Sequence, residues 1–312
     1  MRILVVGAGA IGGYFGGRLH EAGRDVRFLV RPQRARELAQ SGLVIVSPAG
    51  NATLRDVKTV LAENIAQSFD LVLLSCKAYD LGSAILSFAP AVGPSTAILP
   101  LLNGMRHLDE LDSKFGKSRV LGGQCVIAAT LSKERAIVHL NDLHALSFGE
   151  RDGGISERAQ AIATAMRGAK FDVHASENIV QEMWEKWMFL ATLAGGTCLF
   201  RGSVGDILAA PQGTDRLLEL LEECRAAASA NGYPPRADVS ERVRKTVTTA
   251  SPLTASMLRD IESKARIEAD HIIGDLIDRA SAQGKTPIDV RMLRIVYTHL
   301  KAYEARRERE LR

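Results

Sequence analysis

The chain has 312 residues, of which 46% are hydrophobic and 24% are charged, and its formal net charge is +4. This length suits two domains of ordinary size, and this composition is typical of globular proteins. The basic residues are spread along the chain and form no stripe interleaved with aromatic residues, so we predict no nucleic-acid partner. The sequence has no apolar stretch long enough to span a bilayer, so we predict no membrane partner either.

The first half of the chain alternates strand-like and helix-like segments. Arg2–Val6 is an apolar run, followed by a glycine-rich turn, a helix to about Ala22 and a second strand at Val26–Val30. Further apolar runs at Asp70–Cys76 and Thr96–Leu102 are typical of parallel strands buried on both faces. We expect later segments to extend the same sheet: Val120–Ala128, Ala145–Gly149 and Phe171–His174, with a helix near Ser156–Ala169 between the last two.

From Ser176 onward the pattern predicts helices only. The predicted helices are about Glu177–Ala194, Asp215–Asn231, Ala237–Thr249, Leu253–Gln283 and Ile288–Glu304, with turns at "NGYPP" (231–235) and "GKTP" (284–287). We therefore predict an α/β protein whose N-terminal Rossmann-type domain, a doubly wound and mostly parallel sheet, is followed by an all-helical C-terminal domain. The predicted domains are residues 1–175, for a dinucleotide, and residues 176–312, for the substrate and catalysis.

The four cysteines are scattered along the chain, without a C-x-x-C pair: Cys76, Cys125, Cys198 and Cys224. This distribution suits small buried thiols in a reducing compartment better than disulfides or metal ligands. We therefore predict a cytoplasmic protein without a metal site.

The segment "VVGAGAIGG" places Gly7, Gly9 and Gly12 in a G-x-G-x-x-G pattern, directly after a strand and at the start of a helix. In this context the first glycine permits a tight turn, the second lets a pyrophosphate approach the backbone, and the third lets the helix pack on the strand. The helix N-terminus offers N–H groups to the phosphates. We predict that a dinucleotide binds this loop: Gly7, Ala8, Gly9, Ala10, Ile11 and Gly12.

The end of the second strand indicates which dinucleotide binds. That strand ends in "FLVRPQR", where NAD-specific folds usually carry an acid for the ribose 2′-hydroxyl. Arg31 occupies this place, and Arg34 follows one turn later. Because an arginine matches a 2′-phosphate, we predict NADP(H) as the cofactor. The alternative is a surface arginine that starts a helix.

Two polar residues follow buried strands at positions where open α/β sheets bind ligands. Lys77 comes directly after "DLVLLSC", and Asn103 comes directly after "TAILPLL". Each alone could be an exposed strand end. Together with the glycine loop they predict one crevice that holds the nicotinamide and the substrate.

Two charged residues of the second half lie on or beside apolar helix faces. In "EMWEKWMFLATLAGG" (182–196), Lys186 borders a face formed by Met183, Trp187, Leu190, Ala191 and Ala194. Glu268 falls in a predicted stripe with Met257, Ile261, Ala265, Ile272 and Leu276. A carboxylate on an apolar face needs a partner, and Lys186 is a candidate. The pattern leaves open a structural ion pair or a catalytic pair.

These motifs, in their order and spacing, resemble the ketopantoate reductase (2-dehydropantoate 2-reductase) family along nearly the whole chain. The matching elements are "GAGAIG", "RPQR", "CKAYD", "LLNGM", "WEKW", "SMLRD" and "RIEADHI". The resemblance implies an oxidoreductase of pantothenate biosynthesis that uses NADPH to reduce a small 2-oxo acid, ketopantoate, to pantoate. It also suggests a homodimer formed through the helical domain.

The resemblance further implies roles for individual residues. Lys186 would be the proton donor, and Glu268 would offset its charge and order the cofactor and substrate. Ser256 would hydrogen-bond the substrate. The remaining roles concern the cofactor as well: Lys77 and Asn103 would hold the nicotinamide ribose and the substrate, and Ala129 would touch the cofactor through its backbone.

One departure from the family pattern concerns the substrate. The family usually carries asparagines four and eight residues after the catalytic lysine, where this chain has Leu190 and Ala194. A more apolar or bulkier 2-oxo acid would suit these positions. Thr197 could supply one polar contact or could only cap the helix end. Two alternatives stay open: a β-hydroxyacid dehydrogenase, and a non-catalytic NADP(H) sensor.

Overall fold

In the computed structural model, which describes residues 1–282 and 288–311, the chain forms two units. The first unit consists of Met1–Leu102 and His107–Val180. The second consists of Asn103–Arg106 and Gln181–Arg312. The short segment around Asn103 therefore belongs with the helices of the second half. The predicted helix end at Gln283 and the predicted turn at 284–287 lie outside the described residues.

The first unit contains a fully parallel five-stranded sheet in the order β5-β2-β1-β6-β7. The strands are β1 (Arg2–Val6), β2 (Asp25–Leu29), β5 (Lys58–Val60), β6 (Phe69–Leu74) and β7 (Val92–Pro100). The central strands β1 and β6 are apolar because helices or strands cover both faces, and side chains such as Ile3 and Val72 are completely buried. The predicted Rossmann-type sheet is confirmed.

The predicted strands after residue 120 belong to a second sheet together with two earlier strands, so the prediction that they extend the first sheet is wrong. Its strands are β3 (Leu43–Val46), β4 (Ala52–Leu54), β8 (Gly122–Leu131), β9 (Ile137–Gly149) and β10 (Asp172–Ala175), in the order β10-β9-β3-β4 with β8 on β9. Only one parallel bridge, between Ile98 and Val120, is described between the sheets. A strand that extends a parallel sheet needs a crossover connection. β8 and β9 instead follow each other through a short turn and pair antiparallel, which requires no crossover.

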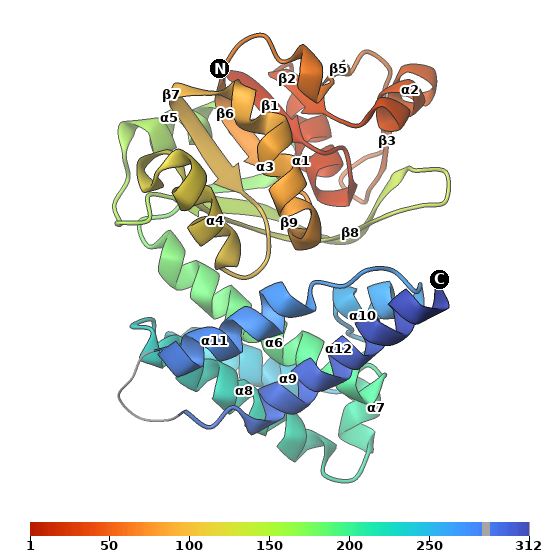
Figure 1. Cartoon of the computed structure of the whole chain (residues 1–312), viewed down its shortest axis with the longest axis vertical. Coiled ribbons are helices and arrows are strands. Elements are labelled where there is room, and N and C mark those ends of the chain that lie inside the picture. Colours follow the sequence, from red (N-terminus) through yellow and green to blue (C-terminus); the bar gives the residue numbers. More distant parts are fainter. Residues whose placement is uncertain (283–287, 312) are drawn as a thin grey trace. The chain divides into compact units, whose positions relative to one another are not determined.

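Helix α1 (Ala10–Glu21) packs against strands of both sheets, and its glycines make this close contact possible (Figure 1). A Cβ atom on Gly16 would lie 2.7 Å from the Phe28 ring of the first sheet. A Cβ atom on Gly17 would lie 2.8 Å from the Leu43 side chain of the second sheet. Both faces of α1 therefore require residues without side chains, which explains the excess of glycine after the dinucleotide motif.

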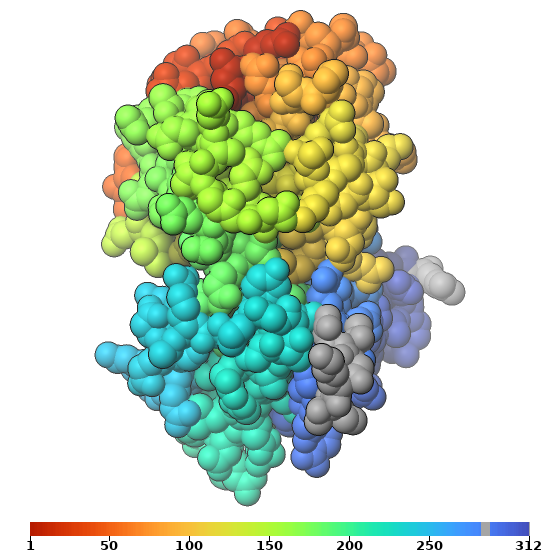
Figure 2. Space-filling model, turned by 90° about the vertical axis from the view of Figure 1, so that its left-hand side faces the viewer, coloured from red at the N-terminus to blue at the C-terminus, as the bar shows by residue number. Residues whose placement is uncertain are grey.

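The other helices of the first unit are short. They are α2 (Pro32–Ser41), α3 (Leu81–Phe88), α4 (Arg106–Phe115, whose first residue belongs to the second unit) and α5 (Glu157–Met166), with single 3₁₀ turns η1 (Ala62–Asn64), η2 (Ala78–Asp80), η3 (Ala89–Ala91) and η4 (Lys117–Arg119). Helix α5 matches the predicted helix near Ser156–Ala169, and the Ser156 hydroxyl caps it by accepting from the Ala159 N–H at 3.1 Å. Figure 2 shows the surface of this unit on one side, formed largely by the yellow and green part of the chain.

The second unit is helical, as predicted. It contains α6 (Ile179–Phe200, whose first two residues belong to the first unit), α7 (Val204–Ala209), α8 (Gly213–Ala230), α9 (Ala237–Thr248), α10 (Ser256–Glu262), the π-helical turn η5 (Asp270–Gly274), α11 (Asp275–Ala282) and α12 (Arg291–Glu310). Helices α6 and α8 pack closely, since a Cβ atom on Gly196 would lie 2.4 Å from Leu217. No helix within the described residues has the length and apolar character needed to cross a membrane.

The single long helix predicted over Leu253–Gln283 is wrong, because the chain leaves the helical path after Glu262. Lys264 adopts a left-handed conformation with φ of +58°. Helix α12 satisfies the carbonyl groups exposed by this break: the Tyr303 hydroxyl donates to the Ala265 oxygen at 2.8 Å, and Arg307 Nε donates to the Lys264 oxygen at 2.8 Å. Glu268 therefore lies in a non-helical segment, not in a continuous helical stripe.

Candidate active site

The glycine loop joins β1 to α1. A side chain would have no room at one of its glycines, Gly12, but would meet no protein atom at another, Gly9. Gly7 has φ of +92°, and its N–H donates to the Leu29 oxygen at 2.9 Å. A Cβ atom on Gly12 would lie 2.1 Å from Ser75 Oγ and 2.5 Å from the Gly7 oxygen, so no other residue fits there unless the loop moves. A Cβ atom on Gly9 would meet nothing within 4 Å.

The open side of this loop carries the N-terminus of α1. Gly9 is the N-cap residue and has no side chain to bond the first N–H groups of the helix. The first turn of α1 contains no acidic residue. The positive end of the helix dipole is therefore not offset within its own first turn, and the surface beside Gly9 is suited to a diphosphate.

The structure distinguishes the two arginines after β2. Arg31 is the N-cap residue of α2, its side chain is 78% exposed, and its guanidinium lies 3.6 Å from the Asp80 carboxylate. Arg34 is buried and donates to the Glu37 carboxylate at 3.1 Å. This hydrogen bond lowers the pKa of Glu37, with a further contribution from Arg135. Arg31 is thus the arginine with surface available for an anion.

The carboxyl ends of neighbouring strands lie level with one another. Val6 pairs with Leu74, and Leu74 pairs with Pro100, so β1, β6 and β7 end at the same edge of the sheet. Ser75, which follows β6, donates from its hydroxyl to the Val6 oxygen at 3.1 Å and borders Gly12. The segment that leads to Lys77 is therefore fixed beside the glycine loop.

The three predicted cofactor contacts beyond the loop have different settings. Lys77 is half-buried and precedes the turn η2. Asn103 is half-buried and belongs to the second unit. Ala129 is half-buried on β8, where it pairs with His139 of β9, so it lies in the second sheet of the first unit. Their contacts with a cofactor stay predictions.

Lys186 is half-buried in α6, and the side chains of its two neighbours in the sequence, Glu185 and Trp187, form hydrogen bonds with other residues. Glu185 is 4% exposed, and its carboxylate accepts from Arg236 Nε at 2.8 Å and from Arg236 Nη2 at 2.5 Å. Burial alone would raise the pKa of Glu185, but hydrogen bonds from Arg236 and Gln181 outweigh it, and the net pKa is lowered. The charge of Glu185 is thus compensated by Arg236.

The apolar face of α6 is confirmed by burial. Its buried members are Met183, Trp187, Ala191 and Ala194, each at most 4% exposed, whereas Leu190 is half-buried. Of the two positions at which the resemblance led us to expect asparagine, Leu190 is therefore more exposed than Ala194.

Thr197 is completely buried and serves the fold instead of a ligand. Its hydroxyl donates to the Leu193 oxygen at 2.7 Å and accepts from the Ala255 N–H at 3.3 Å. Because α6 continues to Phe200, Thr197 lies inside the helix and does not cap its end. The bond fixes the chain one residue before Ser256, which is exposed at the start of α10.

Glu268 is half-buried directly before the helical turn that contains η5. Its backbone oxygen accepts from the Ile272 N–H at 3.0 Å, and the Trp187 indole donates to the Ile272 oxygen at 2.9 Å. A Cβ atom on Gly104 would lie 2.6 Å from the His271 oxygen of the same turn. The segments of Asn103, Lys186 and Glu268 are therefore brought together within the second unit.

Sequence reasoning missed two members of this arrangement. Trp187 was assigned to the core only, although a buried indole N–H needs an acceptor. His271 carries no signal in the sequence pattern, and it is 5% exposed beside Gly104. Burial, together with the positive charges of Arg106 and Arg279, lowers the pKa of His271 to about 4, so the imidazole is neutral at pH 7.

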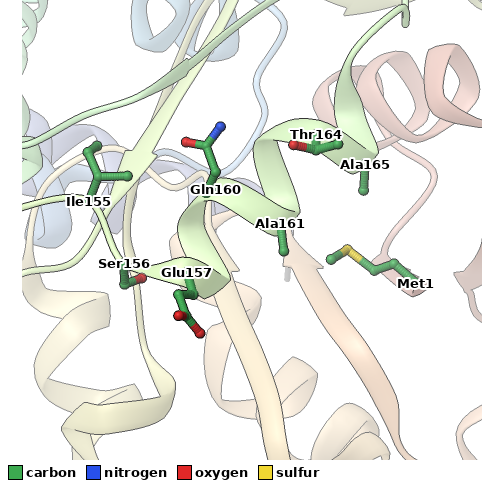
Figure 3. A pocket seen from close by; sticks show the side chains of 8 residues that line it. All are labelled: Met1, Ile155, Ser156, Glu157, Gln160, Ala161, Thr164 and Ala165. Carbon is green, nitrogen blue, oxygen red and sulfur yellow. The ribbon is translucent and has the colours of Figure 1, made fainter.

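A separate surface cavity of about 700 Å³ lies in the first unit. Figure 3 shows its lining, which consists of Met1 and of residues in and just before α5, namely Ile155, Ser156, Glu157, Gln160, Ala161, Thr164 and Ala165. None of the predicted site residues lines this cavity, so it is not the candidate active site.

Two family models match the chain. The model described as "Ketopantoate reductase PanE/ApbA" matches residues 3–153, and the model described as "Ketopantoate reductase PanE/ApbA C terminal" matches residues 178–304. Together they cover most of both units.

Individual proteins match over nearly their full length. The chain is 38% identical to the uncharacterized oxidoreductase YkpB of Bacillus subtilis, over 98% of this chain and 99% of that protein. It is 27% identical to the 2-dehydropantoate 2-reductase of Archaeoglobus fulgidus, over 91% and 92% of the two chains. The crystal structure of 2-dehydropantoate 2-reductase from Geobacter metallireducens superimposes with a TM-score of 0.88 at 26% identity, covering 97% and 99% of the two chains.

Proposed function

The chain belongs to the ketopantoate reductase family, and on this premise we propose that it reduces a 2-oxo acid to the 2-hydroxy acid with NADPH. The observation that carries the proposal is the setting of Lys186, a half-buried residue that borders the apolar face of α6 and whose acidic neighbour Glu185 is paired with Arg236. Glu185 therefore does not need Lys186 as its counter-charge.

The residues of the glycine loop fit a dinucleotide. Gly12 has no room for a Cβ atom, while the backbone at Gly9 is open, and this is the arrangement that a bound pyrophosphate requires. Arg31, exposed at the start of α2, would hold the 2′-phosphate of NADPH. When bound, a reduced nicotinamide supplies a hydride to a carbonyl carbon.

The role we assign to Lys186 is that of general acid. Reduction of a ketone places negative charge on the carbonyl oxygen, and an ammonium group beside that oxygen stabilises the charge and donates the proton. Because this charge is absent from the substrate, the interaction favours the transition state over the ground state. Asn103 and Ser256 would orient the substrate, and Glu268 would offset the charge of Lys186.

Two substrate classes are supported by different observations. Ketopantoate is the first candidate, because the relatives of Archaeoglobus and Geobacter are named 2-dehydropantoate 2-reductases. A 2-oxo acid with a more apolar side chain is the second candidate, because Leu190 is apolar, half-buried and one helical turn from Lys186. An apolar pocket wall cannot replace the hydrogen bonds that a polar substrate group loses there.

The test is NADPH oxidation by the purified protein with a panel of 2-oxo acids that includes ketopantoate, and NADP⁺ reduction with 2-hydroxy and 3-hydroxy acids. We expect turnover with at least one 2-oxo acid. Turnover confined to 3-hydroxy acids would indicate a β-hydroxyacid dehydrogenase, and NADPH binding without turnover on any panel member would indicate a sensor.

A further inference from the structure

The indole of Trp187 connects the helix of Lys186 with the segment of Glu268. Trp187 is 1% exposed, directly follows Lys186 in α6, and donates from Nε1 to the Ile272 oxygen at 2.9 Å. The Ile272 N–H in turn donates to the Glu268 backbone oxygen at 3.0 Å. Two consecutive hydrogen bonds therefore lead from the residue after Lys186 to Glu268 itself.

The turn that accepts this bond is irregular. Residues Asp270–Gly274 form a π-helical turn, in which backbone bonds span five residues, as in the bond from the Asp275 N–H to the Asp270 oxygen. Such a turn is less stable than α-helix and persists when tertiary contacts favour it. Here the indole donates to the Ile272 oxygen, and Gly104 packs against the His271 oxygen.

We propose that Trp187 is a positioning residue, which holds the π-helical turn so that the Glu268 carboxylate and the Lys186 ammonium keep one fixed arrangement. This inference rests on the proposed function, since it assigns Trp187 an effect on the same reaction. Trp187 itself would touch neither substrate nor cofactor. Trp187 acts through its buried indole N–H, which donates a hydrogen bond from α6 to the Ile272 oxygen.

The second tryptophan of α6 provides a matched control. Trp184 is 3% exposed, and its ring stacks on Tyr233 at a centroid distance of 5.7 Å and also lies 5.0 Å from the Trp187 ring. Trp184→Phe and Trp187→Phe therefore remove the same atoms from equally buried sites in one helix. They differ in that only Trp187 donates to the turn beside Glu268.

The experiment measures NADPH-dependent reduction of the 2-oxo acid that the wild-type protein turns over fastest, the pH profile of this reaction, and amide hydrogen exchange of residues 269–275. We expect Trp187→Phe to lower kcat about tenfold, the equivalent of one buried hydrogen bond, and to leave KM for NADPH within about twofold. In the plot of kcat against pH, the midpoint of the decrease at high pH should shift. Amide hydrogen exchange over 269–275 should become faster. Trp184→Phe should show none of these changes.

A second replacement isolates the N–H group if Trp187→Phe does not fold. The chain has two tryptophans, so in the Trp184→Phe background β-(3-benzothienyl)alanine replaces Trp187 alone and puts sulfur in place of the N–H. The same loss of kcat is expected. If either Trp187 replacement leaves kcat, the pH profile of kcat and the exchange over 269–275 as they are in the wild-type protein, this inference is overturned and the proposed function is not. If the wild-type protein itself reduces neither ketopantoate nor any other 2-oxo acid, the proposed function is overturned, and this inference with it.

Discussion

The glycine loop and the surroundings of Lys186 are built in opposite ways. The loop consists of six consecutive residues, 7–12, and its shape follows from glycines at fixed spacing. The surroundings of Lys186 combine segments near residues 103, 186, 256 and 268. The Trp187 indole donates to the Ile272 oxygen, and the Thr197 hydroxyl accepts from the Ala255 N–H. The predicted cofactor site therefore depends on local steric space, whereas the predicted chemical site depends on contacts between distant segments.

The sharpest test of this contrast is Lys186→Ala, which should affect chemistry without affecting the loop. We expect kcat to fall about 10²- to 10⁴-fold, the usual contribution of a general acid. NADPH affinity, measured by fluorescence titration, should stay within about threefold of the wild-type value. Unchanged turnover would remove Lys186 from the mechanism.

Within the loop, Gly12→Ala and Gly9→Ala form a matched pair. The Cβ atom at residue 12 would overlap Ser75 Oγ and the Gly7 oxygen, so we expect destabilisation of about 1–3 kcal/mol and weaker NADPH binding. The Cβ atom at residue 9 meets no protein atom within 4 Å, so Gly9→Ala should weaken NADPH binding without lowering the free energy of unfolding. Equal stability losses in denaturant titrations would contradict this interpretation.

Lowering the pH should destabilise the surroundings of Lys186, because the buried side chain of His271, which lies near Glu268, must then take up a proton. Burial and nearby arginines lower its pKa from 6.5 to about 4 in the folded protein, so between these values the unfolded chain binds the proton and the folded chain does not. Stability is therefore lost as the pH falls from 6.5 toward 4, by about 2 kcal/mol between pH 7 and pH 5. Urea titrations of His271→Gln should show a smaller loss over this interval, and an unchanged loss would refute the assignment.

The smallest expected effect concerns cofactor choice. Arg31→Ala should weaken NADPH binding about tenfold more than NADH binding, because the guanidinium would meet only the 2′-phosphate. Arg34→Ala is the control, since Arg34 is buried on Glu37 and its loss should lower stability without changing the NADPH-to-NADH ratio. Equal weakening of both dinucleotides by Arg31→Ala would exclude the 2′-phosphate assignment.

The same contrast explains what the sequence could predict. Parallel apolar strands, the glycine loop and the helical second half follow from periodicity and spacing, and the structure has them. The second sheet was missed because the strand pattern does not say which strands pair. Here β8 and β9 pair with each other and β9 with β3, which is distant in the chain.

The break before Glu268 was missed for a different reason. No glycine or proline marks it, and the residue in the left-handed conformation is Lys264. The freed carbonyls are bonded by Tyr303 and Arg307, which lie about forty residues further along the chain. Such a break depends on tertiary hydrogen bonds, and helical periodicity continues across it.

The most direct test of the account is a competition reaction that identifies the product. Wild-type protein and Lys186→Ala would each be incubated with NADPH and an equimolar mixture of ketopantoate and more apolar 2-oxo acids, and the 2-hydroxy acids would be quantified by mass spectrometry. We predict that the wild-type protein forms one molecule of 2-hydroxy acid for each NADPH oxidised, and that the variant forms essentially no 2-hydroxy acid. NADPH binding without any 2-hydroxy acid from the wild-type protein, or equal product from both proteins, would contradict the account.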